Sequence, residues 1–118
     1  QLLKLKAAGK LDKVRMLLLT NCTFDGIVYN VERVMEECLA IKPDLIFLWD
    51  EAWFAFARFS PTYRQRTAMN AANTLRAKLR SNDYAEAYEK QQKKLKDADE
   101  ETLLKTRLIP PPSARVRV

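Results

Sequence analysis

The sequence predicts an α/β fold in which two parallel strands are joined by a helix. Two observations predict the strands: short apolar runs at Met16–Leu19 and Leu45–Trp49, each of which stops abruptly at polar residues. A third observation is the amphipathic helix pattern between the two runs. Runs of this length read as strands that are buried on both faces. A strand–helix–strand unit makes its two strands parallel, so the fold class is α/β with a mostly parallel sheet.

The connecting helix has a start signal and a stop signal. Asn30 is a good N-cap, because its side-chain oxygen can accept a hydrogen bond from the first helical turn. The following apolar residues have the i, i+3, i+4, i+7, i+8 spacing of one helix face, namely Val31, Val34, Met35, Cys38 and Leu39. Pro43 ends the helix, because the residue before a proline avoids the helical conformation.

Polar residues follow both predicted strands. The first strand runs into Thr20–Gly26, TNCTFDG, and the second runs into Asp50 and Glu51. Because the strands are parallel, both polar ends lie at the same edge of the sheet. Ligand-handling groups of open α/β sheets sit beyond the carboxyl ends of the strands, so this edge is the candidate site. The aromatic residues that follow are expected to pack in the core: Trp53, Phe54, Phe56 and Phe59.

The flanking residues are predominantly helical. Gly9 is placed to stop a helix over residues 2–8, and Ser60-Pro61 predicts the start of a helix over residues 61–79. Residues 83–105 form a highly charged helical stretch that we expect either to lie on the surface or to reach toward a neighbouring subunit or domain. Ala114–Val118 alternate like a strand that has just begun.

We therefore divide the chain into three parts. Residues 1–63 are the βαβ part, residues 64–109 are a helical, charged insertion, and residues 110–118 begin the next strand. No apolar run is long enough to span a membrane, so no membrane partner is expected.

Composition argues against several classes of function. The 118 residues contain no histidine, and the two cysteines, Cys22 and Cys38, fit no metal spacing, so zinc sites and histidine-activated nucleophiles are not expected. Two cysteines in a chain of this length are no disulfide framework, and a reducing cytoplasm is the expected location. The net charge of +6 is scattered over several segments, and no nucleic-acid partner is expected.

The two polar loops resemble those of one enzyme family. TNCTFDG (Thr20–Gly26) with Tyr29-Asn30, and DEAW (Asp50–Trp53) continuing into FAFARF, are similar to the ornithine/lysine/arginine decarboxylase family. The clear similarity runs from about Met16 to Tyr63, and the order and spacing of the two motifs make it specific. The resemblance implies pyridoxal phosphate as cofactor and the large domain of a PLP-dependent transferase-like (fold type I) architecture, of which the βαβ unit is a portion.

The resemblance also implies roles for individual residues. Asp50 matches the family aspartate that pairs with the pyridinium nitrogen of the cofactor and keeps it protonated. Ala52 matches a small residue against the ring face, and Trp53 an aromatic residue close to the cofactor. Asn21 and Thr23 match the polar loop near the phenolic oxygen and the substrate. Without the resemblance, the residues favour a solvated or helix-capping carboxylate at Asp50. The polar loop can equally be a turn that is capped by its own side chains.

Other parts of the family's site have no match here. No lysine of this chain lies in the serine–threonine–histidine–lysine motif that carries the Schiff-base lysine, although Arg115-Val116-Arg117-Val118 resembles the run-up to it. We therefore expect a fragment that is inactive alone. Its expected partners are an amino-acid substrate, the remainder of a parent chain and further copies in a homo-oligomer.

Two alternatives remain open. One is another fold-type-I enzyme, an aminotransferase or a lyase, because the nitrogen-pairing aspartate is shared across that fold. A histidine–lysine motif after Val118 would favour the decarboxylase. The other is a non-catalytic basic binding module, which salt-dependent binding of DNA or RNA would support.

Overall fold

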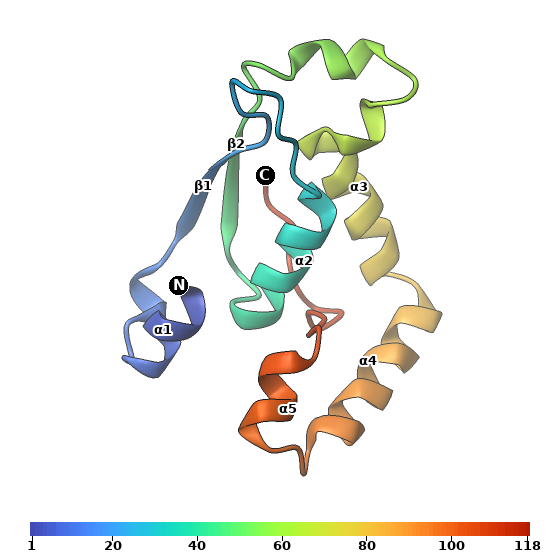
Figure 1. Cartoon of the computed structure of the whole chain (residues 1–118). Coiled ribbons are helices and arrows are strands. Elements are labelled where there is room, and N and C mark those ends of the chain that lie inside the picture. Colours follow the sequence, from blue (N-terminus) through green and yellow to red (C-terminus); the bar gives the residue numbers. More distant parts are fainter.

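Two parallel strands and the helix between them form the centre of the molecule. The computed structural model describes residues 1–118. Strand β1 (Met16–Thr20) pairs with β2 (Ile46–Asp50) in parallel, from Met16 opposite Ile46 to Thr20 opposite Asp50. Helix α2 (Val31–Ile41) connects them and lies against the sheet (Figure 1). The predicted α/β unit is confirmed.

Helix α2 begins and ends where the sequence predicts. The side chain of Asn30 accepts a hydrogen bond from the backbone N–H of Arg33 at 3.1 Å, and the last helical residue is Ile41, two residues before Pro43. The helix buries Val31, Met35 and Leu39 against the sheet. The apolar stripe is therefore what fixes α2 on the strands.

Helix α3 (Ala68–Leu79) packs beside α2 and completes the core. Its buried residues join those of α2 and β2 in one hydrophobic cluster. The predicted helix start at Ser60-Pro61 is wrong, because Ser60 stabilises only a turn: its hydroxyl accepts from the N–H of Tyr63 at 3.4 Å. Two short 3₁₀ helices, η2 (Ala55–Phe59) and η3 (Arg64–Arg66), fill the interval instead.

The remaining elements extend along the chain on either side of this core. Helix α1 (Leu2–Ala7) is followed by Gly9 with φ of +67° and by the 3₁₀ helix η1 (Leu11–Lys13), which leads into β1. The charged stretch forms two helices, α4 (Asn82–Leu95) and α5 (Glu100–Lys105), because Asp99 caps a new helix by accepting from the N–H of Thr102 at 2.8 Å. No helix has both the length and the apolar character needed to cross a bilayer.

The C-terminal residues return to the sheet. Arg117 makes a parallel bridge with Ile46, on the side of β2 away from β1, and the N–H of Phe47 donates to the carbonyl of Arg117 at 2.9 Å. The guanidinium of Arg76 on α3 donates twice to the carbonyl of Val116, at 2.8 and 3.0 Å. The sequence predicts that a strand begins at residues 114–118. In this chain its pairing with β2 is limited to a single bridge.

A buried carboxylate ties the C-terminal segment to the helices. Glu36 of α2 is 1% exposed and accepts from Lys78 Nζ of α3 at 2.7 Å and from a guanidinium nitrogen of Arg107 at 2.6 Å. Nearby, the hydroxyl of Tyr84 on α4 donates to the carbonyl of Pro110 at 2.7 Å. Burial raises the pKa of the Tyr84 hydroxyl. These side chains hold four segments in one arrangement.

The sheet is covered on one face only, which corrects the expectation that the apolar strands are buried on both. Phe47 and Trp49 point toward α2 and α3 and are 1% and 8% exposed. Leu18 and Leu48 point the other way and are 63% and 50% exposed. A continuous apolar sequence is typical of strands that are covered on both faces, but α2 and α3, the two helices of the core, lie on the same face of the sheet.

The expected core packing of the aromatic cluster is correct for one residue of four. Phe54 is buried beside Cys22 and Ala57 in a small second cluster. Trp53, Phe56 and Phe59 are 61%, 60% and 83% exposed. The physical reason is position: residues 51–66 form turns and 3₁₀ helices that project beyond the carboxyl ends of the strands, where no second layer lies over them (Figure 1).

Candidate active site

The two polar loops meet at one edge of the sheet, as predicted. Thr20 lies directly opposite Asp50, and the N–H of Asn21 donates to the carbonyl of Asp50 at 2.9 Å. Farther out, the rings of Phe24 and Trp53 meet edge to face with centroids 5.3 Å apart. The parallel pairing is the cause, because it brings both carboxyl ends to the same level.

Asp50 is the carboxylate that faces outward at this edge. It is exposed, on the same side of the sheet as Thr20, and one of its oxygens accepts from the N–H of Ala52 at 3.0 Å. Its other oxygen has no protein partner. Ala52 and Trp53 are exposed beside it. These three residues therefore leave a carboxylate, a small side chain and an aromatic ring exposed at the end of β2.

Asn21, by contrast, points into the protein. It is completely buried, and its amide nitrogen donates to Glu51 Oε1 at 2.7 Å and to the carbonyl of Arg66 at 3.0 Å. Both amide hydrogens are thus used within the chain. The side-chain oxygen of Asn21 is buried without a partner, as is the indole N–H of Trp49, which projects from β2 on the same helix-covered face.

Thr23 closes a local turn. Its hydroxyl donates to the carboxylate of Asp25 and accepts from the N–H of Ile27 at 2.9 Å. Gly26 adopts φ of +88°, a conformation that glycine reaches without strain. The hydrogen bond from Thr23 holds the pKa of the exposed Asp25 carboxyl below its usual value. The hydrogen bonds at Thr23 are those of the side-chain-capped turn.

Glu51 is the residue whose role the sequence did not reveal. The same oxygen that accepts from Asn21 also accepts from the N–H of Ala68, the first residue of α3, at 2.7 Å. Thr67, at the N-cap, makes no side-chain capping bond, so Glu51 takes its place and brings a negative charge to the helix N-terminus. A partner 17 residues away leaves no local sequence signal.

The adjacent carboxylates Asp50 and Glu51 therefore have different settings. Glu51 joins both strand ends to α3, through Asn21 and Ala68. The carboxylate of Asp50 accepts only from the backbone of its own loop. Glu51 holds the edge of the sheet in shape, whereas one oxygen of Asp50 has no partner within the chain.

Comparison with known proteins identifies the family. The family model described as Orn/Lys/Arg decarboxylase, major domain, matches residues 2–85, a range that includes both loops and α3. The chain is 40% identical over 58 residues to the biodegradative arginine decarboxylase of Escherichia coli, a match that covers 49% of this chain and 7% of that protein.

A second relative gives the same result. The chain is 34% identical over 68 residues to the lysine decarboxylase LdcA of Pseudomonas aeruginosa, which covers 58% of this chain and 9% of that protein. The chain thus matches less than a tenth of the length of either relative. No solved structure matches it. Since the family model covers more than half of the 118 residues, the chain belongs to the Orn/Lys/Arg decarboxylase family, within its major domain.

Proposed function

We propose that this chain forms one wall of the pyridoxal phosphate site of a decarboxylase that acts on a basic amino acid. The observation that carries the proposal is the free carboxylate of Asp50 at the carboxyl end of a parallel strand, inside the DEAW motif. Family membership and the names of the two relatives support an amino-acid decarboxylase. The particular substrate among ornithine, lysine and arginine is left open.

The residues at this edge differ in how well they fit the cofactor. Asp50 has an unused, solvent-facing oxygen that can accept a hydrogen bond from a ring N–H, and Ala52 beside it leaves room for a flat ring. Trp53 adds an exposed aromatic surface. Asn21 and Thr23 already use their donors within the chain. The fit therefore rests on Asp50 and Ala52, whereas Asn21 and Thr23 support the loops that carry them.

The proposed role of Asp50 is electrostatic. When bound, pyridoxal phosphate supplies the acceptor for the electron pair that remains after a substrate loses CO₂. Asp50 would hold a proton on the ring nitrogen, because a carboxylate beside that nitrogen stabilises its positive form. Glu51 and Asn21 would keep Asp50 in place by fixing the two strand ends to α3.

The rest of the proposed site would come from outside these residues. The Schiff-base lysine has no matching motif here, so we propose that the 118-residue chain has no turnover and no specific covalent cofactor site by itself. The parent protein is proposed to be a cytoplasmic homo-oligomer whose remaining residues complete the site around an amino-acid substrate.

A hybrid enzyme tests the role of Asp50. The aligned segment of the Escherichia coli arginine decarboxylase would be replaced by the corresponding residues of this chain, with and without Asp50→Asn. Asp50→Asn should lower kcat at least about a hundredfold and shift the absorbance of the bound cofactor. The reason is that it removes the negative charge beside the ring nitrogen and keeps the shape of the side chain. Asp25→Asn is the matched control, since it removes a carboxylate of the other loop. Equal activity of the two variants would contradict the proposal.

The isolated chain provides a separate test. It would be mixed with pyridoxal phosphate, reduced with borohydride and mapped by mass spectrometry. Slow labelling spread over exposed lysines is expected. Stoichiometric labelling of one lysine would overturn the proposal that the covalent site lies outside this chain.

A further inference from the structure

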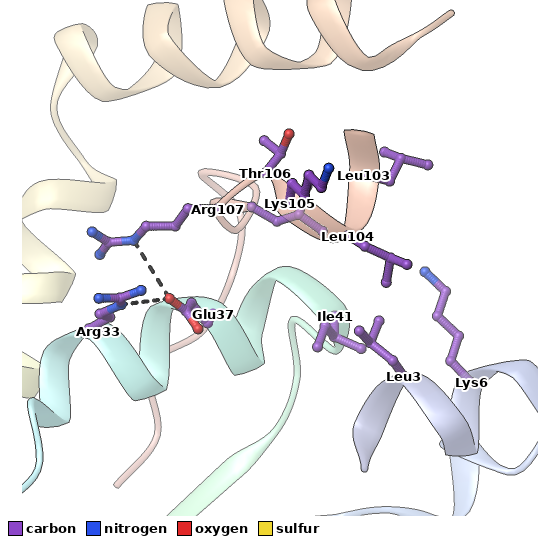
Figure 2. Close-up of a pocket in the computed structure, with 11 residues that line it drawn as sticks. Leu3, Lys6, Arg33, Glu37, Ile41, Leu103, Leu104, Lys105, Thr106 and Arg107 are labelled. Carbon is purple, nitrogen blue, oxygen red and sulfur yellow. Dashed lines mark hydrogen bonds and ion pairs between the residues drawn. The ribbon is translucent and has the colours of Figure 1, made fainter. Parts of the chain in front are cut away.

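A groove between α1, α2 and α5 is separate from the candidate active site. It encloses about 480 Å³, and none of its lining residues belongs to either polar loop. In Figure 2 α2 forms one side, α5 the opposite side and α1 one end. The groove is open to solvent along its length, which makes it accessible to another chain.

The middle of the groove is apolar. Leu3 of α1, Ile41 of α2 and Leu104 of α5 approach one another there (Figure 2). Leu104 is 69% exposed and Leu3 is 49% exposed. Three elements thus contribute aliphatic side chains to one open groove. An apolar patch with a polar rim is typical of a binding surface.

The two ends of the groove carry cations. Lys6 stands at the α1 end and forms no ion pair within the chain (Figure 2). At the other end, Arg33 and Arg107 lie on either side of Glu37, whose carboxylate is 2.8 Å from Arg33 Nε and 3.8 Å from Arg107 Nε. The two arginine side chains remain about half exposed, so both are accessible to a ligand in the groove.

The residues that line the groove carry more positive than negative charge, because Glu37 is the one carboxylate beside four cations: Lys6, Arg33, Lys105 and Arg107. Buried Glu36 also binds Arg107, at 2.6 Å, and Lys78, at 2.7 Å. Lys78 also lies 3.7 Å from Glu32, so three cations share three carboxylates behind this end, and of these carboxylates only Glu37 lines the groove. Lys105 adds a further positive charge on the α5 side and is paired only with exposed Glu101 of its own helix. The groove as a whole favours a negatively charged occupant.

We propose that this groove binds an acidic segment of a partner protein in which a few apolar residues are flanked by carboxylates. The apolar residues would cover Leu3, Ile41 and Leu104, and the flanking carboxylates would meet Lys6 at one end and Arg33 at the other. Guanidinium donors suit this role because they bind carboxylates in pairs. A short amphipathic segment laid in a groove between helices is a common mode of peptide recognition.

Peptide binding measured by fluorescence anisotropy tests the proposal on the complete 118-residue chain. The probe is a labelled peptide with two leucines flanked by glutamates. It should bind with a Kd below about 1 mM and bind more weakly as salt is raised. One control peptide has lysine flanks and another has serines in place of the leucines. Each should bind at least about tenfold more weakly.

Variants then place the peptide in the groove. Leu104→Ser should weaken binding about tenfold, because an exposed leucine loses the apolar cover that the peptide provides. Lys6→Glu should weaken it about fivefold through an exposed ion pair. The matched control is Lys93→Glu on exposed α4, outside the groove, which should leave binding unchanged. Circular dichroism would confirm that all three variants are folded.

Several results would overturn the proposal. They are no binding of the acidic peptide, equal binding of the lysine-flanked peptide, or full binding by Leu104→Ser and Lys6→Glu. Self-association that Leu104→Ser abolishes, without peptide binding, would instead assign the groove to a second copy of the chain.

Discussion

The two faces of the sheet both carry large apolar residues but have different surroundings. On one face, Phe47 and Trp49 are buried under α2 and α3. On the other, Met16, Leu18 and Leu48 are half exposed or more. Large apolar side chains thus stand on both faces, although Thr20 and Asp50 also lie on the open one, and the stability that each face can contribute to this chain differs.

The covered face contributes to the stability of the fold, whereas the open face leaves its apolar residues exposed. Burial of apolar surface stabilises a fold in proportion to the area removed from water, and only the helix-covered face removes it here. Parallel sheets of α/β proteins are normally covered on both faces. The open face, the exposed aromatic residues and Asp50 all lie where the chain contributes little to its own core.

The largest expected effect compares the two faces directly. Phe47→Ala should lower the free energy of unfolding by about 4 kcal/mol, because it leaves a cavity in the core. Leu48→Ala, the adjacent residue on the open face, should change it by less than about 1 kcal/mol. Urea unfolding followed by circular dichroism measures both. Similar losses for the two variants would show that the open face is covered in solution.

A second comparison contrasts a buried and an exposed carboxylate on one helix. Glu36→Ala should cost about 2–3 kcal/mol, because it removes the shared partner of Lys78 and Arg107. The loss stays at the low end for a buried ion pair, since both cations are partly exposed and can be hydrated. Glu37→Ala is the control, and its solvent-exposed pairs should be worth less than about 1 kcal/mol.

These comparisons also show where the sequence was informative. The strands, the limits of α2 and the meeting of the two loops follow from local signals: apolar runs, Asn30, Pro43 and the rule that a βαβ unit is parallel. The DEAW motif led to Asp50, and DEAW together with TNCTFDG led to the family. In each case neighbouring residues along the chain hold the information.

What the sequence missed depends on contacts between distant residues. The bond from Ala68 to Glu51 spans 17 residues, and the bond from Arg107 to Glu36 spans 71. Hydrophobicity alone also could not tell whether Leu18 or Phe59 has a cover, because the cover is another element. The proposed roles of Asp50, Ala52, Trp53, Asn21 and Thr23 stay predictions.

A third comparison separates the adjacent carboxylates at the candidate site. Glu51→Ala should lower the free energy of unfolding by about 1–2 kcal/mol, because it removes the acceptor for Asn21 and for the first N–H of α3. Asp50→Ala should change it by less than about 0.5 kcal/mol, since that carboxylate is exposed. Chemical denaturation measures both. A larger loss for Asp50→Ala than for Glu51→Ala would show that Asp50, and not Glu51, has the structural role.

The smallest expected effect concerns the buried hydroxyl of Tyr84 on α4. Tyr84→Phe should cost about 1 kcal/mol at neutral pH, because it removes the bond to the carbonyl of Pro110. Tyr63→Phe is the control: its hydroxyl, on the exposed segment, has no partner, and the expected change is below about 0.5 kcal/mol.

The pH dependence of this effect has a definite sign. Burial raises the pKa of Tyr84 in the folded protein, so the unfolded chain loses this proton first. The contribution of the hydroxyl is therefore complete below the unfolded pKa of about 10 and declines as the pH rises beyond it. The stability difference between wild type and Tyr84→Phe should shrink between neutral pH and strongly alkaline pH. A difference that stays constant would show that the Tyr84 hydroxyl is open to solvent. The bond to Pro110 would then not be one of the contacts that hold the C-terminal segment.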